Sequence, residues 1–118
     1  MGIKNGMRPV HPGEVLREEY LKPLRLSVNA LAKALLLTPS RINDIVLERR
    51  GVSADTAVRL ARYFGGTAQF WLNLQALYDL RVAERSAATK KAVKSIEPYK
   101  QRRNEFGEVE GFAAPAHG

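Results

Sequence analysis

The stretch that decides the fold runs from Ser27 to Leu47 and reads SVNALAKALLLTPSRINDIVL. Ser27 is a good N-cap, and the apolar residues after it recur at the spacing of one helix face, which predicts a helix over 28–35. Only a pair of leucines separates this helix from Thr38, a second N-cap that is followed by a proline at the first helical position. Short helices joined by so tight a turn cross steeply, so the stretch predicts a helix-turn-helix.

Helix start and stop signals predict three further helices, at about 12–22, 54–64 and 68–84. Each begins with a proline or with a side chain that can accept a hydrogen bond from the first turn. Pro23 predicts that the first of them does not continue much beyond Lys22, because proline lacks the amide that a helix interior needs. No strand alternation appears, so we expect an all-α, five-helix domain over residues 1–85.

Composition limits the classes to which the protein can belong. Of the 118 residues, 45% are apolar and 26% are charged, which is typical of a globular protein. The absence of cysteine rules out a disulfide framework and a zinc finger, and it favours a reducing compartment. There is no targeting segment and no apolar run of membrane length, so we expect a soluble, cytoplasmic protein without a membrane partner. The 19 lysines and arginines outnumber the 12 acids, which favours phosphate-rich partners.

The C-terminal extension, residues 86–118, has no sustained apolar period and contains two prolines, so we expect it to be mostly disordered. Six basic residues, Lys90, Lys91, Lys94, Lys100, Arg102 and Arg103, precede the acidic Glu105, Glu108 and Glu110. A phosphate-binding arm and a merely solvated tail both fit this pattern.

The second helix of the pair, over 39–46, has an apolar side and a side that is polar, small and close to the helix start. These are the properties that a reader of the DNA major groove needs. Asparagine can pair with adenine, aspartate with the cytosine amino group, and leucine with the thymine methyl group. The predicted base-reading residues are Pro39, Ser40, Asn43, Asp44 and Leu47.

A second set of residues is placed to hold the DNA backbone. Amides at helix N-termini donate hydrogen bonds to phosphates, and arginines beside the helix add charge. The predicted phosphate and flanking residues are Ser27, Asn29, Thr38, Arg41, Arg49 and Arg50. The polar side could instead be an ordinary solvated face; the tight turn, the basic cluster and the basic domain together favour DNA.

Clustered motifs carry a resemblance to a known family. They are His11-Pro12-Gly13-Glu14, Arg41-Ile42-Asn43-Asp44-Ile45-Val46, Arg49-Arg50-Gly51, Asp55-Thr56-Ala57 and Phe70-Trp71-Leu72-Asn73-Leu74-Gln75. Together they resemble the HigA family of antitoxins, which belongs to the XRE-type, lambda-repressor-like helix-turn-helix proteins. The resemblance runs from Met7 to Glu84 and lends nothing to the tail.

The resemblance implies a homodimer that binds a palindromic operator, represses its own toxin–antitoxin operon and neutralises a HigB-type, messenger-RNA-cleaving toxin by direct binding. Leu36 departs from the family, whose turn commonly has glycine there. Because a left-handed backbone is costly for any other residue, we expect this turn to be built differently.

The last predicted helix has two apolar stripes, of which a small domain can bury only one. We expect the first to face the core; it comprises Phe70, Trp71, Leu74, Leu77 and Tyr78. The second comprises Leu72, Ala76, Leu80 and Ala83, and we expect it to form a two-fold dimer interface. A tail that folds back over this stripe, or a toxin that covers it, are the alternatives.

Other functions find less support. His11 and His117 lie without an acid cluster at metal spacing, and we expect His11 to serve the start of the first helix. No serine is paired with a base, so we expect neither an enzyme nor a metal or cofactor. A stand-alone regulator without a toxin, and a protein-interaction module that does not bind DNA, stay open as alternatives.

Overall fold

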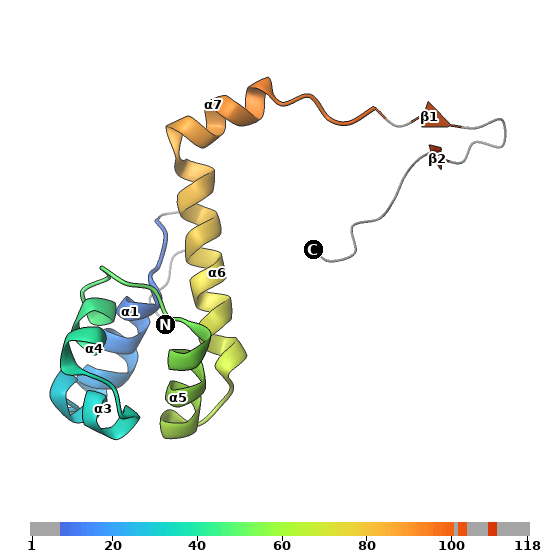
Figure 1. Cartoon of the computed structure of the whole chain (residues 1–118). Coiled ribbons are helices and arrows are strands. Elements are labelled where there is room, and N and C mark those ends of the chain that lie inside the picture. The colour runs from blue at the N-terminus through green and yellow to red at the C-terminus, as the bar shows by residue number, and fades with distance from the viewer. Residues whose placement is uncertain (1–7, 101, 104–108, 111–118) are drawn as a thin grey trace. The chain divides into compact units, whose positions relative to one another are not determined.

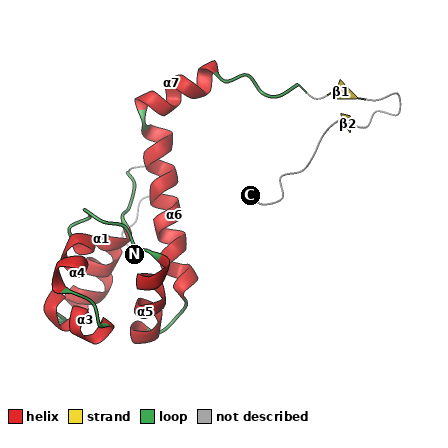
Figure 2. Cartoon of the chain, viewed as in Figure 1, coloured by secondary structure: helices red, strands yellow, loops and turns green. Residues whose placement is uncertain are grey.

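The computed structural model describes residues 8–100, 102–103 and 109–110. Two compact units make up the chain, Met1–Ser86 and Ala87–Gly118. The described part of the first unit consists of helices and short loops (Figure 2). In chain order the helices are α1 (Pro12–Val15), η1 (Leu16–Leu21), α2 (Lys22–Leu24), α3 (Val28–Leu35), α4 (Pro39–Val46), α5 (Ala54–Phe64) and α6 (Ala68–Arg85), labelled in Figure 1 where room allows. Since α1, η1 and α2 run on as one helix, the predicted all-α, five-helix domain is confirmed.

The first helix contains a π-helical segment that its sequence did not predict. The segment before Pro23, η1, is a π-helix, in which the Lys22 amide donates to the Arg17 carbonyl five residues earlier. This wider turn leaves room for the proline ring beside the preceding carbonyls, so the helix continues to Leu24. The helix then ends at its C-cap Arg25, whose φ of 53° is left-handed, so it does not continue far beyond Lys22, as expected.

The helix-turn-helix folds as predicted, with a polar cap at the start of each helix. The Ser27 hydroxyl accepts the Ala30 amide at 3.0 Å, and the Thr38 hydroxyl accepts the Arg41 amide at 3.3 Å. Each cap satisfies one of the first-turn amides that a helix leaves without an internal acceptor.

Leu36, in the turn between α3 and α4, has a left-handed backbone with φ of 59°. The expectation that a non-glycine residue would change the construction of this turn is therefore wrong. The amide of Leu37 donates to the Ala32 carbonyl at 2.9 Å. Arg59 donates Nη1 to the carbonyls of Leu35 and Leu36 at 2.8 and 3.1 Å. These bonds satisfy the carbonyls at the end of α3 and offset a backbone cost of about 1–2 kcal/mol.

The core of the first unit lies between all its longer helices and centres on Trp71, which is fully buried. Its buried apolar residues are Val15, Leu16, Leu21, Leu31, Ala32, Leu35, Ile42, Ile45, Val46, Val52, Ala57, Leu60 and Trp71. In this core α1 approaches α4 so closely that a Cβ on Gly13 would lie 1.8 Å from the Ile45 carbonyl oxygen. Glycine is required there because any side chain would push the two helices apart.

The two sides of α6 are divided differently from the prediction. Trp71 and Leu74 pack in or against the core as expected, but Phe70 and Leu77 are 40% and 47% exposed. Leu72, expected on the outer stripe, packs against the core. The reason is Gln75, which the apolar pattern could not place: its side chain turns inward and accepts the Val52 amide at 2.8 Å. The outward apolar side of α6 therefore comprises Phe70, Ala76, Leu77, Leu80 and Ala83, with Leu72 at its edge.

In the second unit, α7 spans Ala87–Ser95, and a two-residue strand β1 (Arg102–Arg103) pairs antiparallel with β2 (Val109–Glu110). The expectation of disorder is therefore wrong for residues 87–95. Alanine and lysine favour the helix even though apolar residues are too few for a periodic pattern. The rest of that expectation, at residues 101, 104–108 and 111–118, lies outside the described residues. None of the described helices has the length and apolar character needed to cross a membrane.

Candidate nucleic-acid interface

The start of α4 presents the predicted base-reading residues. Ser40 and Asn43 are exposed on consecutive turns, while Ile42 is fully buried on the opposite side of the helix. Leu47, 47% exposed, follows at the C-terminal cap. Pro39 is exposed at the first helical position. Four of the five predicted residues therefore form one accessible edge of α4, which consists of Pro39, Ser40, Asn43 and Leu47.

Asp44 lies at the border of this edge and is half-buried. Its carboxylate lies 3.7 Å from the Arg49 guanidinium, and its carbonyl accepts the Arg49 amide at 2.8 Å. The Arg50 amide donates to the same carbonyl at 3.2 Å. Asp44 therefore orients the turn that carries the two arginines, and its charge is partly balanced before any DNA approaches.

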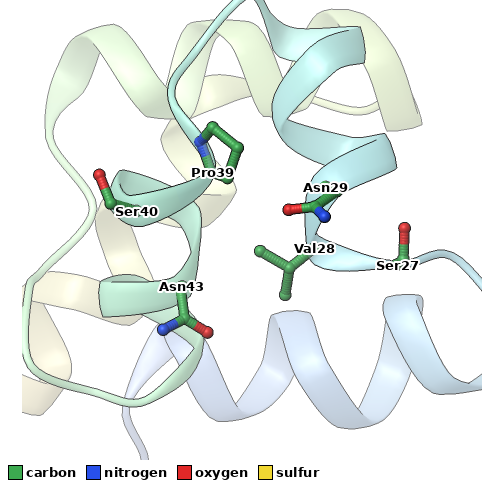
Figure 3. Close-up of a pocket in the computed structure, with 6 residues that line it drawn as sticks. All are labelled: Ser27, Val28, Asn29, Pro39, Ser40 and Asn43. Carbon is green, nitrogen blue, oxygen red and sulfur yellow. The ribbon is translucent and has the colours of Figure 1, made fainter.

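An open hollow of about 370 Å³ separates the first turns of α3 and α4. Figure 3 shows its lining: Ser27, Val28 and Asn29 from α3 and its cap, and Pro39, Ser40 and Asn43 from α4. Both helices thus begin beside the same hollow. A phosphate group fits this arrangement because helix N-termini combine hydrogen-bond donors with partial positive charge.

Arginines flank the edge on both sides. Arg41 lies 3.9 Å from the Asp55 carboxylate of α5, which directs its guanidinium while leaving it 38% exposed. Arg49 and Arg50 are exposed in the turn after α4. Cations in such positions are suited to contact with a phosphate backbone, which carries no sequence information but can fix the register of a bound duplex.

Three side chains that support the edge were missed by the sequence reasoning. Arg17 donates to the Val46 carbonyl at the end of α4, and Arg59 holds the turn at its beginning. Asp55 pairs with Arg59 at 3.0 Å in addition to Arg41. The spacing of Asp55 and Arg59, four residues apart on one helix, signals their pairing, whereas nothing in the sequence signals the contact of Arg17 with residues 29 positions away.

His11 belongs to the fold and not to the edge. It is buried, and its Nδ1 accepts the Gly13 amide at 2.8 Å, which confirms its predicted place at the start of the first helix. Its ring meets that of Tyr78 edge-on, with centroids 4.8 Å apart. Burial lowers the pKa of His11 below the usual 6.5, against the opposing effect of the Glu48 and Asp79 carboxylates. Within the described part of the chain no cluster of side chains could hold a metal ion; His117 lies outside it.

Comparison with known proteins agrees with this geometry. A helix-turn-helix family model matches residues 18–71. The antitoxin HigA of Pseudomonas aeruginosa, solved with the higBA promoter, is 52% identical and superposes with a TM-score of 0.72, over 77% of this chain and 98% of that one. Antitoxin HigA-1 of Vibrio cholerae is 37% identical over 78 residues, which are 65% of this chain and 72% of the relative.

The chain belongs to the HigA family of helix-turn-helix antitoxins. A third relative, virulence-associated protein I of Dichelobacter nodosus, is 68% identical over 81 residues, 69% of this chain and 75% of that protein. The motifs that carry the HigA resemblance have structural roles in this chain. Gly13 allows α1 to pack closely against α4, and Asp55 forms ion pairs with Arg41 and Arg59. Trp71 is buried in the core, and Gln75 accepts a hydrogen bond from the Val52 amide just before α5.

Proposed function

We propose that this HigA-family protein is a homodimer that binds a palindromic operator in its own promoter and represses its operon. The observation that carries the proposal is the exposed edge of α4, with its polar Ser40 and Asn43 beside the outward N-terminus of α3. Support comes from the P. aeruginosa relative, which was solved with its promoter. The protein would act in the cytoplasm, where that DNA is, and we propose no enzymatic role.

In this proposal the first turns of α4 enter the major groove. Asn43 pairs with an adenine, Ser40 contacts a neighbouring base edge, and Leu47 touches a thymine methyl group. Asp44 contributes by accepting a cytosine amino hydrogen or by orienting Arg49. Phosphates bind the first-turn amides around Ser27, Asn29 and Thr38, and they bind Arg41, Arg49 and Arg50 at the flanks.

The dimer contact is proposed on the outward apolar side of α6. Leu80 is 51% exposed there and Leu77 is 47% exposed, flanked by the small Ala76 and Ala83. A second copy of the same face, applied by a two-fold axis, would cover these side chains and present two α4 helices about 34 Å apart to successive major grooves. Sedimentation velocity of the purified chain tests this contact. A monomer would contradict the dimer and would favour an α6 face that is covered by the chain's own tail or by a toxin.

Neutralisation of a HigB-type toxin is the second half of the proposal, and it rests on family membership. It is tested by co-expressing the protein with the product of the neighbouring gene. A toxin that co-purifies, and whose messenger-RNA cleavage stops in the complex, supports it. If the neighbouring gene encodes no toxin and none co-purifies, the protein is a stand-alone regulator, and the repressor half is unaffected.

The decisive experiment measures binding to a duplex from the chain's own promoter and to an unrelated duplex. Replacing Asn43 with alanine is expected to weaken operator binding by about 1–3 kcal/mol and to change unrelated binding far less, because only base contacts carry sequence. Ser40→Ala should act in the same direction, and Glu19→Ala, an exposed change elsewhere, should do neither. Equal binding of both duplexes by the unmodified protein would contradict the proposal and favour a protein-interaction module.

A further inference from the structure

Helix α7 concentrates positive charge on one side. Lys90, Lys91 and Lys94 are exposed, and at about 100° per residue they fall within about 100° of the helix circumference. No acidic residue occurs in Ala87–Ser95. The charge continues beyond the helix, since residues 87–103 hold six basic side chains and a single acid, Glu97.

These lysines are not balanced within the described part of the chain. No ion pair between described residues includes a lysine of α7. In contrast, Lys22 of α2 lies 2.8 Å from the Glu18 carboxylate. Lys90 and Lys94 are four residues apart, so their repulsion destabilises the helix by about 0.2–0.5 kcal/mol. A nine-residue helix is marginal by itself, and a bound polyanion would relieve the repulsion.

The other side of α7 narrows the choice of polyanion. It carries the small residues Ala88, Thr89 and Ala92, with Val93 59% exposed at its border. Helices that lie on membranes bury large apolar side chains such as tryptophan, phenylalanine and leucine, and α7 has none of these. Lysine is a mobile point charge suited to phosphates that need no fixed geometry. The chemistry fits a phosphodiester backbone better than a lipid surface.

We propose that α7 is a second DNA-binding element, whose lysines contact the phosphates of duplex DNA without reading its sequence. This inference rests on the proposed function, because that function brings the protein to duplex DNA. α7 would add affinity and α4 would add discrimination. Each lysine that neutralises a phosphate displaces condensed counterions, so its signature is the salt dependence of binding.

The test uses the full chain with Lys90, Lys91 and Lys94 all replaced by glutamine. Affinity for the promoter duplex and for an unrelated duplex is measured by fluorescence anisotropy across a series of salt concentrations. The plot of log affinity against log salt should become shallower by about 0.9 for each phosphate that is no longer neutralised, or up to about 2.7 per protomer. Affinity for both duplexes should fall by the same factor, because phosphate binding carries no sequence information. Glutamine preserves helix propensity, and circular dichroism checks that the helix content is retained.

The matched control replaces the same three lysines with arginine, which keeps the charge and should keep the slope. An unchanged slope in the glutamine variant would overturn the inference, as would a fall in affinity confined to the promoter duplex. A glutamine variant that keeps its slope but no longer binds a co-purifying protein would identify α7 as a protein-docking helix and also overturn it. Failure of the proposed function has a different signature, namely no preference for the promoter duplex in the unmodified protein.

Discussion

Leu36 has a left-handed backbone, which is strained for leucine, and a side chain that is 84% exposed and therefore buries little apolar area. We expect Leu36→Gly to raise the free energy of unfolding by about 0.5–1 kcal/mol, because the relief of backbone strain outweighs the added freedom of the unfolded chain. Urea unfolding followed by circular dichroism measures this change.

The matched control is Leu47→Gly, at another exposed leucine, whose φ of −87° any residue adopts. That substitution should lower stability, because the unfolded chain gains freedom and the half-buried side chain loses its apolar contacts, with no backbone strain to relieve. If both variants lose stability alike, the backbone of Leu36 is not strained.

Single residues also show which features a sequence can predict. Ser27 and Thr38 cap helices as expected, because a cap bonds to an amide three residues away and depends on local chemistry alone. Arg59 could not be placed in the same way. Its bonds join carbonyls more than 20 residues away, and that distance is closed only by the tertiary fold.

Among the helices, the contact of α1 with α4 sets the position of the exposed edge of α4. Gly13→Ala would place a methyl group against the Ile45 carbonyl, a backbone atom that cannot turn aside. We expect a loss of about 3 kcal/mol or more in the free energy of unfolding, together with weaker operator binding. Urea unfolding and anisotropy on the promoter duplex measure the two effects.

Gly51→Ala is the comparison for this variant. Its new Cβ would meet the Gln75 side chain at 2.8 Å, and a flexible side chain can move away at the expense of its bond to Val52. The loss of stability should therefore be smaller than for Gly13→Ala. A Gly13→Ala protein as stable as the unmodified one would show that α1 and α4 do not pack this closely.

Helix positions were predictable to within a few residues, because caps and prolines mark their ends, whereas helix faces were less so. The pattern assigned Phe70 to the core and Leu72 to the outside, since it counted apolar residues and ignored Gln75. A half-buried amide that satisfies a backbone donor can take the place of an apolar side chain at the core, and no apolar periodicity reports it. The π-helix of η1 was missed for a similar reason, because its sequence reads as an ordinary helix.

At the scale of the whole molecule, His11 makes stability depend on pH. Burial lowers its pKa in the folded state below the value of 6.5, so the unfolded chain takes up the proton first as pH falls. The stabilisation is complete above about pH 6.5 and is lost progressively as pH falls through the lowered folded pKa. Thermal unfolding between about pH 8 and pH 5.5 should show this decline.

His11→Asn should abolish that dependence, because asparagine accepts the Gly13 amide and does not titrate. Glu14 does not interfere: its hydrogen bond with Arg8 lowers its pKa below 4.5, outside this range. A decline of equal size in the asparagine variant would show that another group is responsible.

The molecule as a whole was predictable in class and family but not in its second unit. Charge and composition described residues 86–118 as a polar tail, and they could not reveal that nine of them form a helix. The edge of α4 was predictable because it is a local amphipathic helix. Its supports, Arg17 and Arg59, come from other helices, so they emerge only in three dimensions.

Those supports have a consequence for how an operator would be selected. Arg59 donates to the turn that leads into α4, and Arg17 donates to the carbonyl at its end, so both ends of the helix are held in place before a duplex binds. The protein then loses little conformational entropy on binding, and any difference in shape between the two surfaces must be accommodated by deformation of the DNA. Base pairs that no side chain reaches would thereby influence the choice of site, through the ease with which they bend and twist.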